Sequence, residues 1–464
     1  MKKALIGGFL VVLAIAITPL LTGYQARLAL GQGVTALSQQ TQLHAVIDTV
    51  DAQWRHSYLT FNVTFSLSGE EPLHVPVKVD LQHGPVLSDS DIALSRAVIT
   101  VDGDQLRDTL LWDKQSALYT LTLTQRLDGS LSWQDTLAPF TFSDDSNDTT
   151  LAFSGYQGSG RSEQQTTTYR GHSDVTYFRQ QETLLALRDM NLTGWFDSDM
   201  PRLLTGGVVP GEFVVQLGKF DLQADPVVQI DGLQYATRGD VDISSDRIDM
   251  TLDINADRVT LDRYEITDMA LQVSVKNLMQ ALFDALKQRN ADAALVGNSQ
   301  PMQVDGPLRE ALLQQLQRAP TLAIPTLTMN LPEGQLSASG SATVKDVIAL
   351  PQQQDIAAFW YQHLVADAQI TTRLPVARAL ARHYVKHQMA LAMKNSEQPS
   401  EAQYEGMLAY NTQMLLDGLV QQGLLQRDEE NIKSEFSLQD GEAILNGNRI
   451  PLPAPSPDSP TDEQ

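Results

Sequence analysis

The chain has 464 residues, of which 42% are apolar, 56 are acidic, 33 are basic and none is cysteine. At about 150 residues per domain, this length allows two or three globular domains or one extended domain. A net charge of −23 argues against nucleic acid as a partner, because phosphate binding needs clustered Lys and Arg. The lack of cysteine excludes disulfides, thiolate catalysis, cysteine-ligated metal centres and a lipoprotein attachment site.

An apolar segment near the N-terminus predicts a membrane anchor. Residues 4–21 are interrupted only by two glycines, one threonine and one proline, and as a helix they would cover about 27 Å, close to the thickness of a bilayer core. Lys2 and Lys3 precede the segment, so the positive-inside rule places residues 1–3 in the cytoplasm and the remaining chain in the periplasm. A cleaved signal peptide is the alternative, but its apolar region is usually shorter, at about 7–15 residues.

The next segment, residues 22–58, is predicted to be a helical lead-in, because apolar residues recur there at irregular helical spacing. The period changes at residue 59. Phe61, Val63 and Phe65 alternate with polar residues, which indicates a strand with one buried face. The same alternation through 59–276 and 320–350 predicts a mainly antiparallel sheet with one solvated face.

Three other segments depart from this alternation. Residues 143–173 have few apolar side chains and predict a long loop or a loosely packed hairpin. Residues 277–318 and 353–427 show helical spacing and predict amphipathic helices that pack on the sheet or on one another. The predicted fold class is therefore α+β: a large twisted sheet with packed helices in a body spanning 59–450. The acidic, Pro-rich tail, 451–464, is predicted to be disordered.

Candidate catalytic and metal-binding patterns are weak. His383 and His387 are four residues apart, but Tyr384 stands where a zinc protease would need Glu. Four aspartates between Asp249 and Asp262 have strand spacing and predict a solvated acidic face, with weak calcium binding as the alternative. No Lys-Ser/Thr follows the glycines between Gly155 and Gly160, so a phosphate-binding loop is not expected. The sequence thus predicts no catalytic residue, no cofactor and no metal.

Two short motifs are distinctive. His83-Gly84-Pro85 directly follows a predicted strand and is interpreted as a strand terminator, because Pro cannot donate to a ladder. A functional histidine is the alternative reading of His83. Asn446-Gly447 lies between two alternating runs and predicts a type I′ hairpin turn, a structural role.

The order of these features resembles the YdgA-like family of bacterial envelope proteins of unknown function. The resemblance rests on the Lys-Lys anchor, on 54–58 (Trp-Arg-His-Ser-Tyr), on 81–87 with the His-Gly-Pro step, on 421–425, and on 440–452 with the Asn-Gly turn. It implies a single-pass inner-membrane protein with a periplasmic body. It implies no reaction.

Two functions from different classes remain open. The first is a non-enzymatic envelope protein that binds a lipid-like or apolar ligand along a concave sheet face. The second is an envelope scaffold or assembly factor that binds a protein partner through its helices. An undetected hydrolase is a third hypothesis.

Overall fold

The computed structural model describes residues 43–65, 73–107, 110–113, 115–144, 147–205, 208–242, 244–262, 264–296, 306–351, 356–392 and 400–451. The predicted anchor at 4–21 and nearly all of the predicted tail lie outside these residues. The chain divides into two compact units. Unit 1 comprises residues 1–228, 238–241 and 283–304, and unit 2 comprises 229–237, 242–282 and 305–464.

Unit 1 is built on antiparallel strands. They are β1 (Leu43–Ala52), β2 (His56–Phe65), β3 (Leu73–His83), β4 (Ser95–Val101), β5 (Leu110–Leu111), β6 (Tyr119–Gln125), β7 (Leu131–Leu137), β8 (Phe140–Asp144), β9 (Thr149–Phe153), β10 (Tyr156–Glu163), β11 (Thr166–Gln180), β12 (Thr183–Phe196) and β13 (Gly211–Gln223). A 3-10 turn, η1 (Asp104–Leu106), and a short helix, α2 (Met200–Thr205), also belong to this unit.

The strands of unit 1 pair in the order β1-β2-β3-β4-β6-β7-β10-β11-β12-β13. The long strand β11 pairs along one edge first with β10 and then with β9, and β8 and β5 continue outward from β9. The main buried cluster of this unit joins Leu59 and Phe61 of β2 to Val77, Val79 and Leu81 of β3 and Ala97 of β4.

Strand β14 (Val228–Asp242) and helix α3 (Gln280–Val296) have residues in both units. The other elements of unit 2 are β15 (Arg247–Leu261), β16 (Tyr264–Leu278), α4 (Gly306–Gln317), β17 (Thr321–Leu331), β18 (Gly334–Val344), α5 (Ile356–His363), β19 (Leu364–Arg373), α6 (Leu374–Ala392), α7 (Glu401–Gln421), β20 (Gln426–Asp428), β21 (Asn431–Gln439), β22 (Glu442–Leu445) and β23 (Asn448–Ile450).

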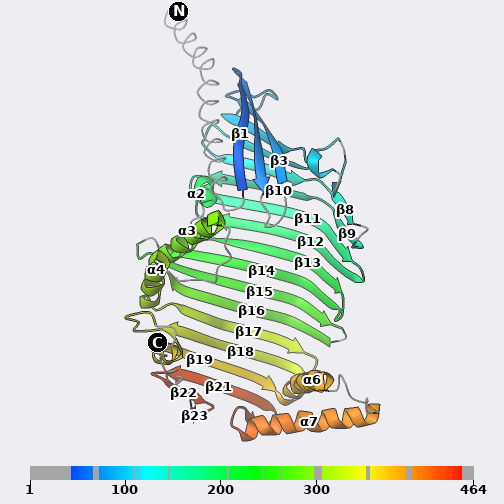
Figure 1. Cartoon of the computed structure of the whole chain (residues 1–464), viewed down its shortest axis with the longest axis vertical. Coiled ribbons are helices and arrows are strands. Elements are labelled where there is room, and N and C mark those ends of the chain that lie inside the picture. The colour runs from blue at the N-terminus through cyan, green and yellow to red at the C-terminus, as the bar shows by residue number, and fades with distance from the viewer. Residues whose placement is uncertain are drawn as a thin grey trace, which may run out of the picture. The chain divides into compact units, whose positions relative to one another are not determined.

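The strands of unit 2 are also antiparallel, in the order β15-β16-β17-β18-β19-β21. The far edge of β21 pairs with β20 and with the small hairpin β22-β23. Helices α6 and α7 lie side by side at this end of the unit (Figure 1). Buried clusters join α6 and α7 to each other and to Ile432 of β21, while a further cluster holds Phe359 of α5 against Val344 and Val347.

The predicted α+β class, with a large antiparallel sheet and few helices, is confirmed, but two segments were predicted wrongly and a third only partly correctly. Within the expected helical lead-in at 22–58, residues 43–52 form β1, because they pair along their whole length with β2. Within the expected helical region at 353–427, Leu364–Arg373 forms β19, which pairs with β18 on one side and β21 on the other. The segment 143–173 was expected to be a long loop or a loosely packed hairpin; it comprises the end of β8, β9, β10 and part of β11, and β10 and β11 do pair as a hairpin.

Glycines opposite aromatic rings explain why the third segment forms strands. Gly160 of β10 pairs with Trp133 of β7, and a Cβ on Gly160 would overlap the Trp133 ring. Likewise, a Cβ on Gly171 would overlap the ring of Tyr156. The aromatic rings therefore lie over the glycine backbone and supply the contacts that glycine side chains cannot, a known way to stabilise glycine in sheets.

Candidate functional site

An apolar face runs along the first two strands that lie wholly in unit 2. Residues directly opposite each other on antiparallel strands share a face of the sheet. Four such pairs between β15 and β16 are apolar: Met250–Val275, Leu252–Val273, Ile254–Leu271 and Ala256–Met269. The intervening pairs, Thr251–Ser274, Asp253–Gln272 and Asn255–Ala270, lie on the other face and are mostly polar.

The alternation then changes phase by one residue. Two further apolar pairs, Val259–Ile266 and Leu261–Tyr264, begin three positions beyond Ala256 and Met269 rather than two. Between Ile266 and Met269 lies Asp268, with φ of 49°, and the register between β16 and β17 shifts at this place. A bulge residue with positive φ takes up one position, so the apolar residues before and after it lie on one continuous face.

Unit 1 has the same arrangement. Apolar pairs between β12 and β13 stand on both sides of Asp189, which has φ of 55°: Leu192–Val215, Met190–Leu217, Leu187–Phe220 and Leu185–Leu222. The spacing between Met190 and Leu187 is again three. Gly, Asn and Asp tolerate positive φ best, and Gly155, between β9 and β10, and Gly232, within β14, also adopt it.

In unit 1 the apolar face extends outward to β9 and β8. Phe178 of β11 lies opposite both Leu185 and Leu151, and Leu151 lies opposite Phe142. The rings of Phe140 and Phe153 are tilted against each other at a centroid distance of 5.2 Å. These side chains form a broad aromatic and aliphatic surface.

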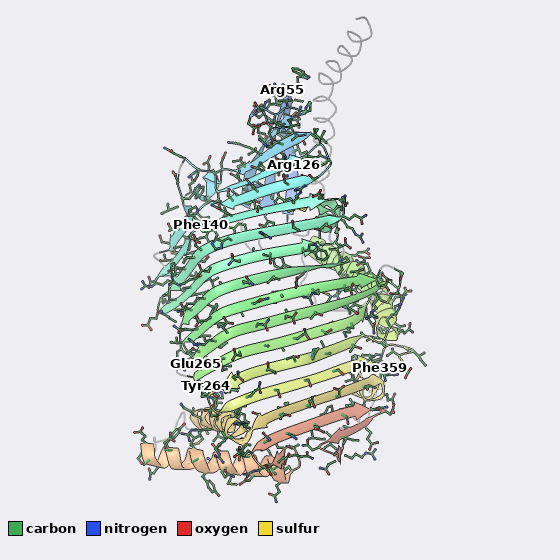
Figure 2. All side chains as sticks on the ribbon, turned by 180° about the vertical axis from the view of Figure 1, so that it is seen from behind. Arg55, Arg126, Phe140, Tyr264, Glu265 and Phe359 are labelled. Carbon is green, nitrogen blue, oxygen red and sulfur yellow. The ribbon has the colours of Figure 1, made fainter. Side chains whose placement is uncertain are left out.

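Most side chains of these faces are only half-buried. Among the residues of β15 and β16, Ile248 and Ala256 are the buried apolar ones, and the other apolar side chains keep part of their surface open. Figures 1 and 2 give opposite views, and in neither does a described helix cross the middle of β15 to β17. Tyr264 marks one end of these strands in Figure 2. Within the described residues, the apolar face of unit 2 thus shows none of the helical cover that a sheet core normally has.

The opposite face of unit 1 is polar. An open groove of about 520 Å³ is lined there mainly by Gln134, Gln157, Arg170, His172 and Asn191. His172 lies within 2.8 Å of Asp174 and 2.9 Å of the Asn191 side-chain oxygen. The Asp174 carboxylate, followed by the Asn191 amide, raises the pKa of His172. Most side chains that line this groove are polar, whereas ligand pockets are lined mainly by apolar side chains.

The His83-Gly84-Pro85 motif ends β3 in a buried setting. The Ser57 hydroxyl lies 3.1 Å from Nε2 of His83, and the carbonyl of Trp54 lies 3.3 Å from Nδ1. The Gly84–Pro85 bond is cis, and a Cβ on Gly84 would overlap the carbonyl of Ala93. The motif therefore terminates the strand and lets the chain return closely past its own end.

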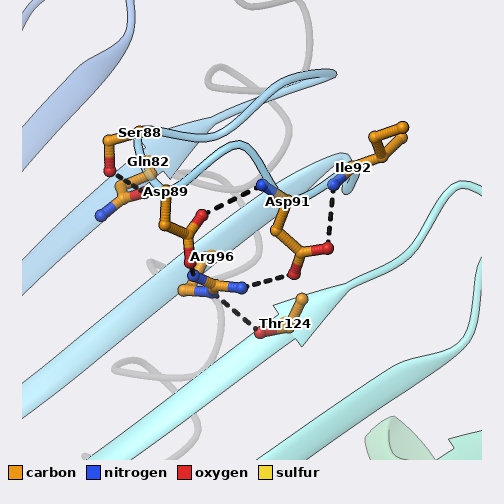
Figure 3. Close-up of polar contacts among 7 residues, drawn as sticks. All are labelled: Gln82, Ser88, Asp89, Asp91, Ile92, Arg96 and Thr124. Carbon is orange, nitrogen blue, oxygen red and sulfur yellow. Dashed lines mark hydrogen bonds and ion pairs between the residues drawn. The ribbon is translucent and has the colours of Figure 1, made fainter.

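The segment that follows this motif is held by ion pairs (Figure 3). Arg96 contacts Asp89 through one guanidinium nitrogen and lies 2.6 Å from Asp91 through the other, while its Nε donates to Thr124 at 3.3 Å. The hydrogen bond from Arg96 lowers the pKa of Asp89. These contacts fix the return segment against the sheet.

Asn446-Gly447 forms the two-residue turn between β22 and β23, since Leu445 pairs with Asn448. Both residues have positive φ, 52° and 81°, as a type I′ turn requires. The Asn446 side chain also accepts from the Glu435 amide at 2.8 Å and donates to the Gly423 carbonyl at 2.8 Å. It thereby ties the hairpin to β21 and to the end of α7.

Comparison with protein families found a match to a family described as bacterial protein of unknown function (DUF945), over residues 1–453. The chain belongs to the DUF945 family. Comparison with curated proteins and with solved structures found no match. The resemblance to the YdgA-like proteins is compatible with this membership, which itself supplies no activity, ligand or partner.

The other sequence-predicted positions of this DUF945 chain lie apart. His383 and His387 are both exposed on α6. Asp249 pairs with Arg247, and Asp253 accepts from Gln272 at 2.8 Å. Within the described part of the chain, no three His, Asp or Glu side chains are grouped so that they could hold a metal ion, and no helix is long and apolar enough to cross a membrane.

Sequence reasoning missed one polar cluster. Asp135 of β7 is buried, and Tyr169 of β11 donates to its two oxygens at 3.3 and 3.1 Å, while the Tyr169 hydroxyl also contacts that of Tyr156. Burial raises the pKa of Asp135, although the bond from Tyr169 lowers it, and burial raises the pKa of Tyr119 nearby to about 12. The sequence held one signal for this cluster: Tyr156, Gly158 and Gly160 are spaced by two, which places a tyrosine and two glycines on one face of a strand.

Proposed function

We propose that this DUF945 protein is a non-enzymatic envelope protein that binds a lipid acyl chain, or a similarly apolar ligand, along an apolar sheet face. The observation that carries the proposal is the continuous row of mostly half-buried apolar side chains on β15 and β16, without a described helix across it. Monomeric proteins rarely leave large contiguous apolar surfaces open unless these bind something.

The length of this face suits an acyl chain. From Met250 to Leu261 the apolar pairs of β15 and β16 cover eleven steps along the strand, or about 37 Å at about 3.4 Å per residue. One leaflet of a bilayer core is about 15 Å thick, half of the whole. A fully extended acyl chain would therefore remain in contact with apolar side chains along its entire length.

The energetics also favour an apolar ligand. Completing the burial of a half-exposed aliphatic side chain contributes about 1 kcal/mol, roughly half of the value for full burial. Twelve residues form the six apolar pairs on β15 and β16. Covering only part of this set would offset the cost of ordering a flexible chain.

The proposal includes the location given by the N-terminal sequence. Residues 4–21 would anchor the chain in the bacterial inner membrane, with residues 1–3 in the cytoplasm and the body in the periplasm, as in the YdgA-like proteins that it resembles. Such an anchor would hold the apolar face close to a supply of lipid. The family is bacterial, which is compatible with this location.

The test uses the full chain in its own membrane. Bacteria expressing it are fed a fatty acid that carries a photoreactive diazirine, irradiated and lysed under denaturing conditions, and the adducts are mapped by mass spectrometry. We expect adducts on peptides from β15 and β16 in addition to those on residues 4–21, which serve as an internal control. Adducts on the anchor peptide alone would refute the proposal.

A matched pair of variants shows whether the adducts depend on the apolar face. Leu271→Glu places a charge on this face, and Asn255→Glu places the same charge on the opposite face of the neighbouring strand. We expect loss of sheet adducts only in the Leu271 variant. Circular dichroism of both variants shows whether either one has unfolded.

A further inference from the structure

Two rows of polar residues cross the strands β7, β10, β11 and β12 in the open groove of unit 1. Within each row, the residues lie directly opposite one another on neighbouring strands and so share one face of the sheet. All of these side chains are exposed except that of Asn191, which is half-buried. The first row is Gln134, Ser159, Arg170 and Thr193, and the second is Thr136, Gln157, His172 and Asn191.

Three long side chains of these rows are available to a ligand. Gln134, Gln157 and Arg170 make no hydrogen bond or ion pair with any residue that the structure describes. Each amide offers two donors and an acceptor, and the guanidinium offers five donors in a planar fork. His172 and Asn191, in contrast, are bonded to each other. The groove therefore combines a fixed pair of side chains with three that can turn toward a bound molecule.

The charge around Arg170 is opposite in sign to that of the whole chain. Although the protein has a net charge of −23, no residue that lines the groove is acidic. Two acids at its borders already have partners, because Asp174 contacts His172 and Glu212 contacts Arg238. Arg170 is thus a positive charge without a carboxylate partner, and a carboxylate on a ligand would form a charge-assisted hydrogen bond with it.

An exposed indole ring borders the groove. Trp195 lies two positions beyond Thr193 on β12, on the same face of the sheet, and 49% of its surface is exposed. It is diagonal to Arg170 across β11 and β12, at a separation that long and aromatic side chains can bridge. The C–H groups of a sugar ring pack on such an aromatic face, while its hydroxyls bond to amides and hydroxyls alongside.

We propose that this groove binds a saccharide chain that carries carboxylate groups. Trp195 would hold one sugar ring, Gln134 and Gln157 would bond to hydroxyl groups, and Arg170 would bind a carboxylate. The two rows cross four strands, or about 14 Å at about 4.8 Å between neighbouring strands, so a chain of several rings would fit. A polar ligand also suits a groove with a mostly polar lining.

Two other polymers fit this groove less well. An extended peptide commonly binds by adding a strand to a free sheet edge, whereas β7, β10, β11 and β12 are each paired on both sides. A nucleic acid needs several phosphate contacts, and of the residues that line the groove Arg170 alone is a base without a carboxylate partner. The groove lies in unit 1, so the inference is independent of the ligand proposed for β15 and β16.

The test uses the full chain, purified without sugar-based detergent, because such a detergent could occupy the groove. Isothermal titration calorimetry measures the binding of tetrasaccharides of galacturonate, of guluronate and of hyaluronan, each compared with its carboxyl-reduced form. Tetraglutamate supplies a control with the charges but without sugar rings. We expect at least one acidic saccharide to bind, and its reduced form to bind about ten-fold more weakly. Failure of all three acidic saccharides to bind, or equal binding of tetraglutamate, would overturn the proposal.

A matched pair of arginine variants locates the site. Arg170→Gln should weaken binding of the acidic saccharide about ten-fold and leave binding of the reduced form unchanged. Arg126→Gln makes the same change at an exposed position between β6 and β7, outside the groove lining, and should have no effect. Equal binding by these two variants would place the saccharide elsewhere and overturn the proposal.

Trp195 distinguishes a saccharide from a simple anion. Trp195→Ala should weaken binding of both the acidic and the reduced form roughly five-fold, whereas Trp195→Phe keeps an aromatic face and should restore part of the loss. Unchanged binding in Trp195→Ala would mean that no sugar ring packs there and would refute the proposed pose. Circular dichroism shows whether each variant is folded. Leu271→Glu should leave saccharide binding intact, so failure of one proposal is distinguishable from failure of the other.

Discussion

The hydroxyl of Ser57 lies 3.1 Å from Nε2 of His83, and both side chains are almost completely shielded from solvent, with 0% and 2% of their surface exposed. The Trp54 carbonyl near Nδ1 can only accept, so Nδ1 carries the proton and Nε2 accepts from the serine. A serine nucleophile would need the same tautomer. Because no substrate could reach Ser57 without local unfolding, the geometry favours a structural role in joining β2 to the end of β3.

Replacing Ser57 with Ala should therefore lower the free energy of unfolding by about 1–3 kcal/mol, because a buried imidazole nitrogen loses a donor. Urea unfolding followed by circular dichroism measures this change. Ser88→Ala removes a hydroxyl that donates to Gln82 at an exposed site and should change stability by less than about 0.5 kcal/mol. Equal effects of the two substitutions would contradict the structural role.

The variants Ser57→Ala and Ser88→Ala also test the hypothesis that the chain is a hydrolase. A fluorophosphonate probe reacts with serines that are both activated and accessible, so we expect no labelling of Ser57 in the folded chain. Labelling that disappears in Ser57→Ala but persists in Ser88→Ala would show that Ser57 and His83 open to solvent and act as nucleophile and base.

Substitution of Gly160 by Ala should destabilise the sheet of unit 1. The new methyl group would overlap the Trp133 ring and approach the Thr168 carbonyl, and overpacking of this kind costs about 1–3 kcal/mol. The near-ultraviolet circular dichroism of Trp133 should change as well, because the ring must move.

Gly418→Ala is the matched control for this substitution. Gly418 lies inside α7, and nothing lies within 4 Å of a Cβ placed there. Ala at this site should raise stability by about 1 kcal/mol, the difference in helix propensity. The opposite signs at the two sites are the expected result, and a loss at both would mean that glycine matters for a reason other than space.

The alternation of apolar and polar residues predicted a large antiparallel sheet, which the structure has, but β1 and β19 show where such patterns fail. Leu43 and Ile47 are four apart, which fits a helix as well as a strand. The pairing of β1 with β2, like the pairing of β19 with two neighbours, is a long-range interaction that local spacing does not contain. The β-branched residues Val46, Thr49 and Val50 did favour a strand at β1, because such residues are enriched in strands.

The candidate site was predicted only in outline. The alternation showed that one sheet face is apolar, but it cannot show how far that face is covered, because burial depends on elements remote in sequence. The phase shifts were readable in principle, since Asp189 and Asp268 each interrupt an apolar alternation with a spacing of three. Whether the apolar residues of neighbouring strands line up on one face depends on which residues of the two strands pair, and this register cannot be read from the sequence.

Asp189 allows a test of the phase shift. Its positive φ suits Gly and opposes β-branched residues. Asp189→Gly should therefore be nearly neutral, whereas Asp189→Val should cost about 1–2 kcal/mol. Thermal unfolding of the two variants measures the difference, and equal stability would mean that β12 does not need this conformation.

The burial of Asp135 should give the free energy of unfolding an unusual dependence on pH. Burial raises its pKa above the ordinary 3.8, so above that value the folded state holds a proton that the unfolded state has lost. The contribution of Asp135 therefore falls as pH rises through this window, opposite to that of a paired carboxylate. Asp135→Asn keeps an acceptor for Tyr169 and should raise Tm at about pH 8 more than at about pH 4.

Asp135→Ala provides the comparison. It removes both the charge and the acceptor of the Tyr169 hydroxyl, and leaving that hydroxyl without this partner costs about 1–3 kcal/mol. A higher stability for Ala than for Asn would show that the Tyr169 bond contributes nothing and that the charge alone matters.

Asn446 combines a backbone role with a side-chain role, and the two can be separated. Asn446→Asp preserves the acceptor for the Glu435 amide but replaces the donor that serves the Gly423 carbonyl with a second oxygen. The lost bond and the repulsion between oxygens should lower stability by about 1–3 kcal/mol. Gly447→Asn keeps a residue that tolerates positive φ, with nothing within 4 Å of its Cβ, and should cost less than about 1 kcal/mol. A larger loss at Gly447 than at Asn446 would mean that the turn conformation, and not the link from the hairpin to the end of α7, is what the Asn-Gly step provides.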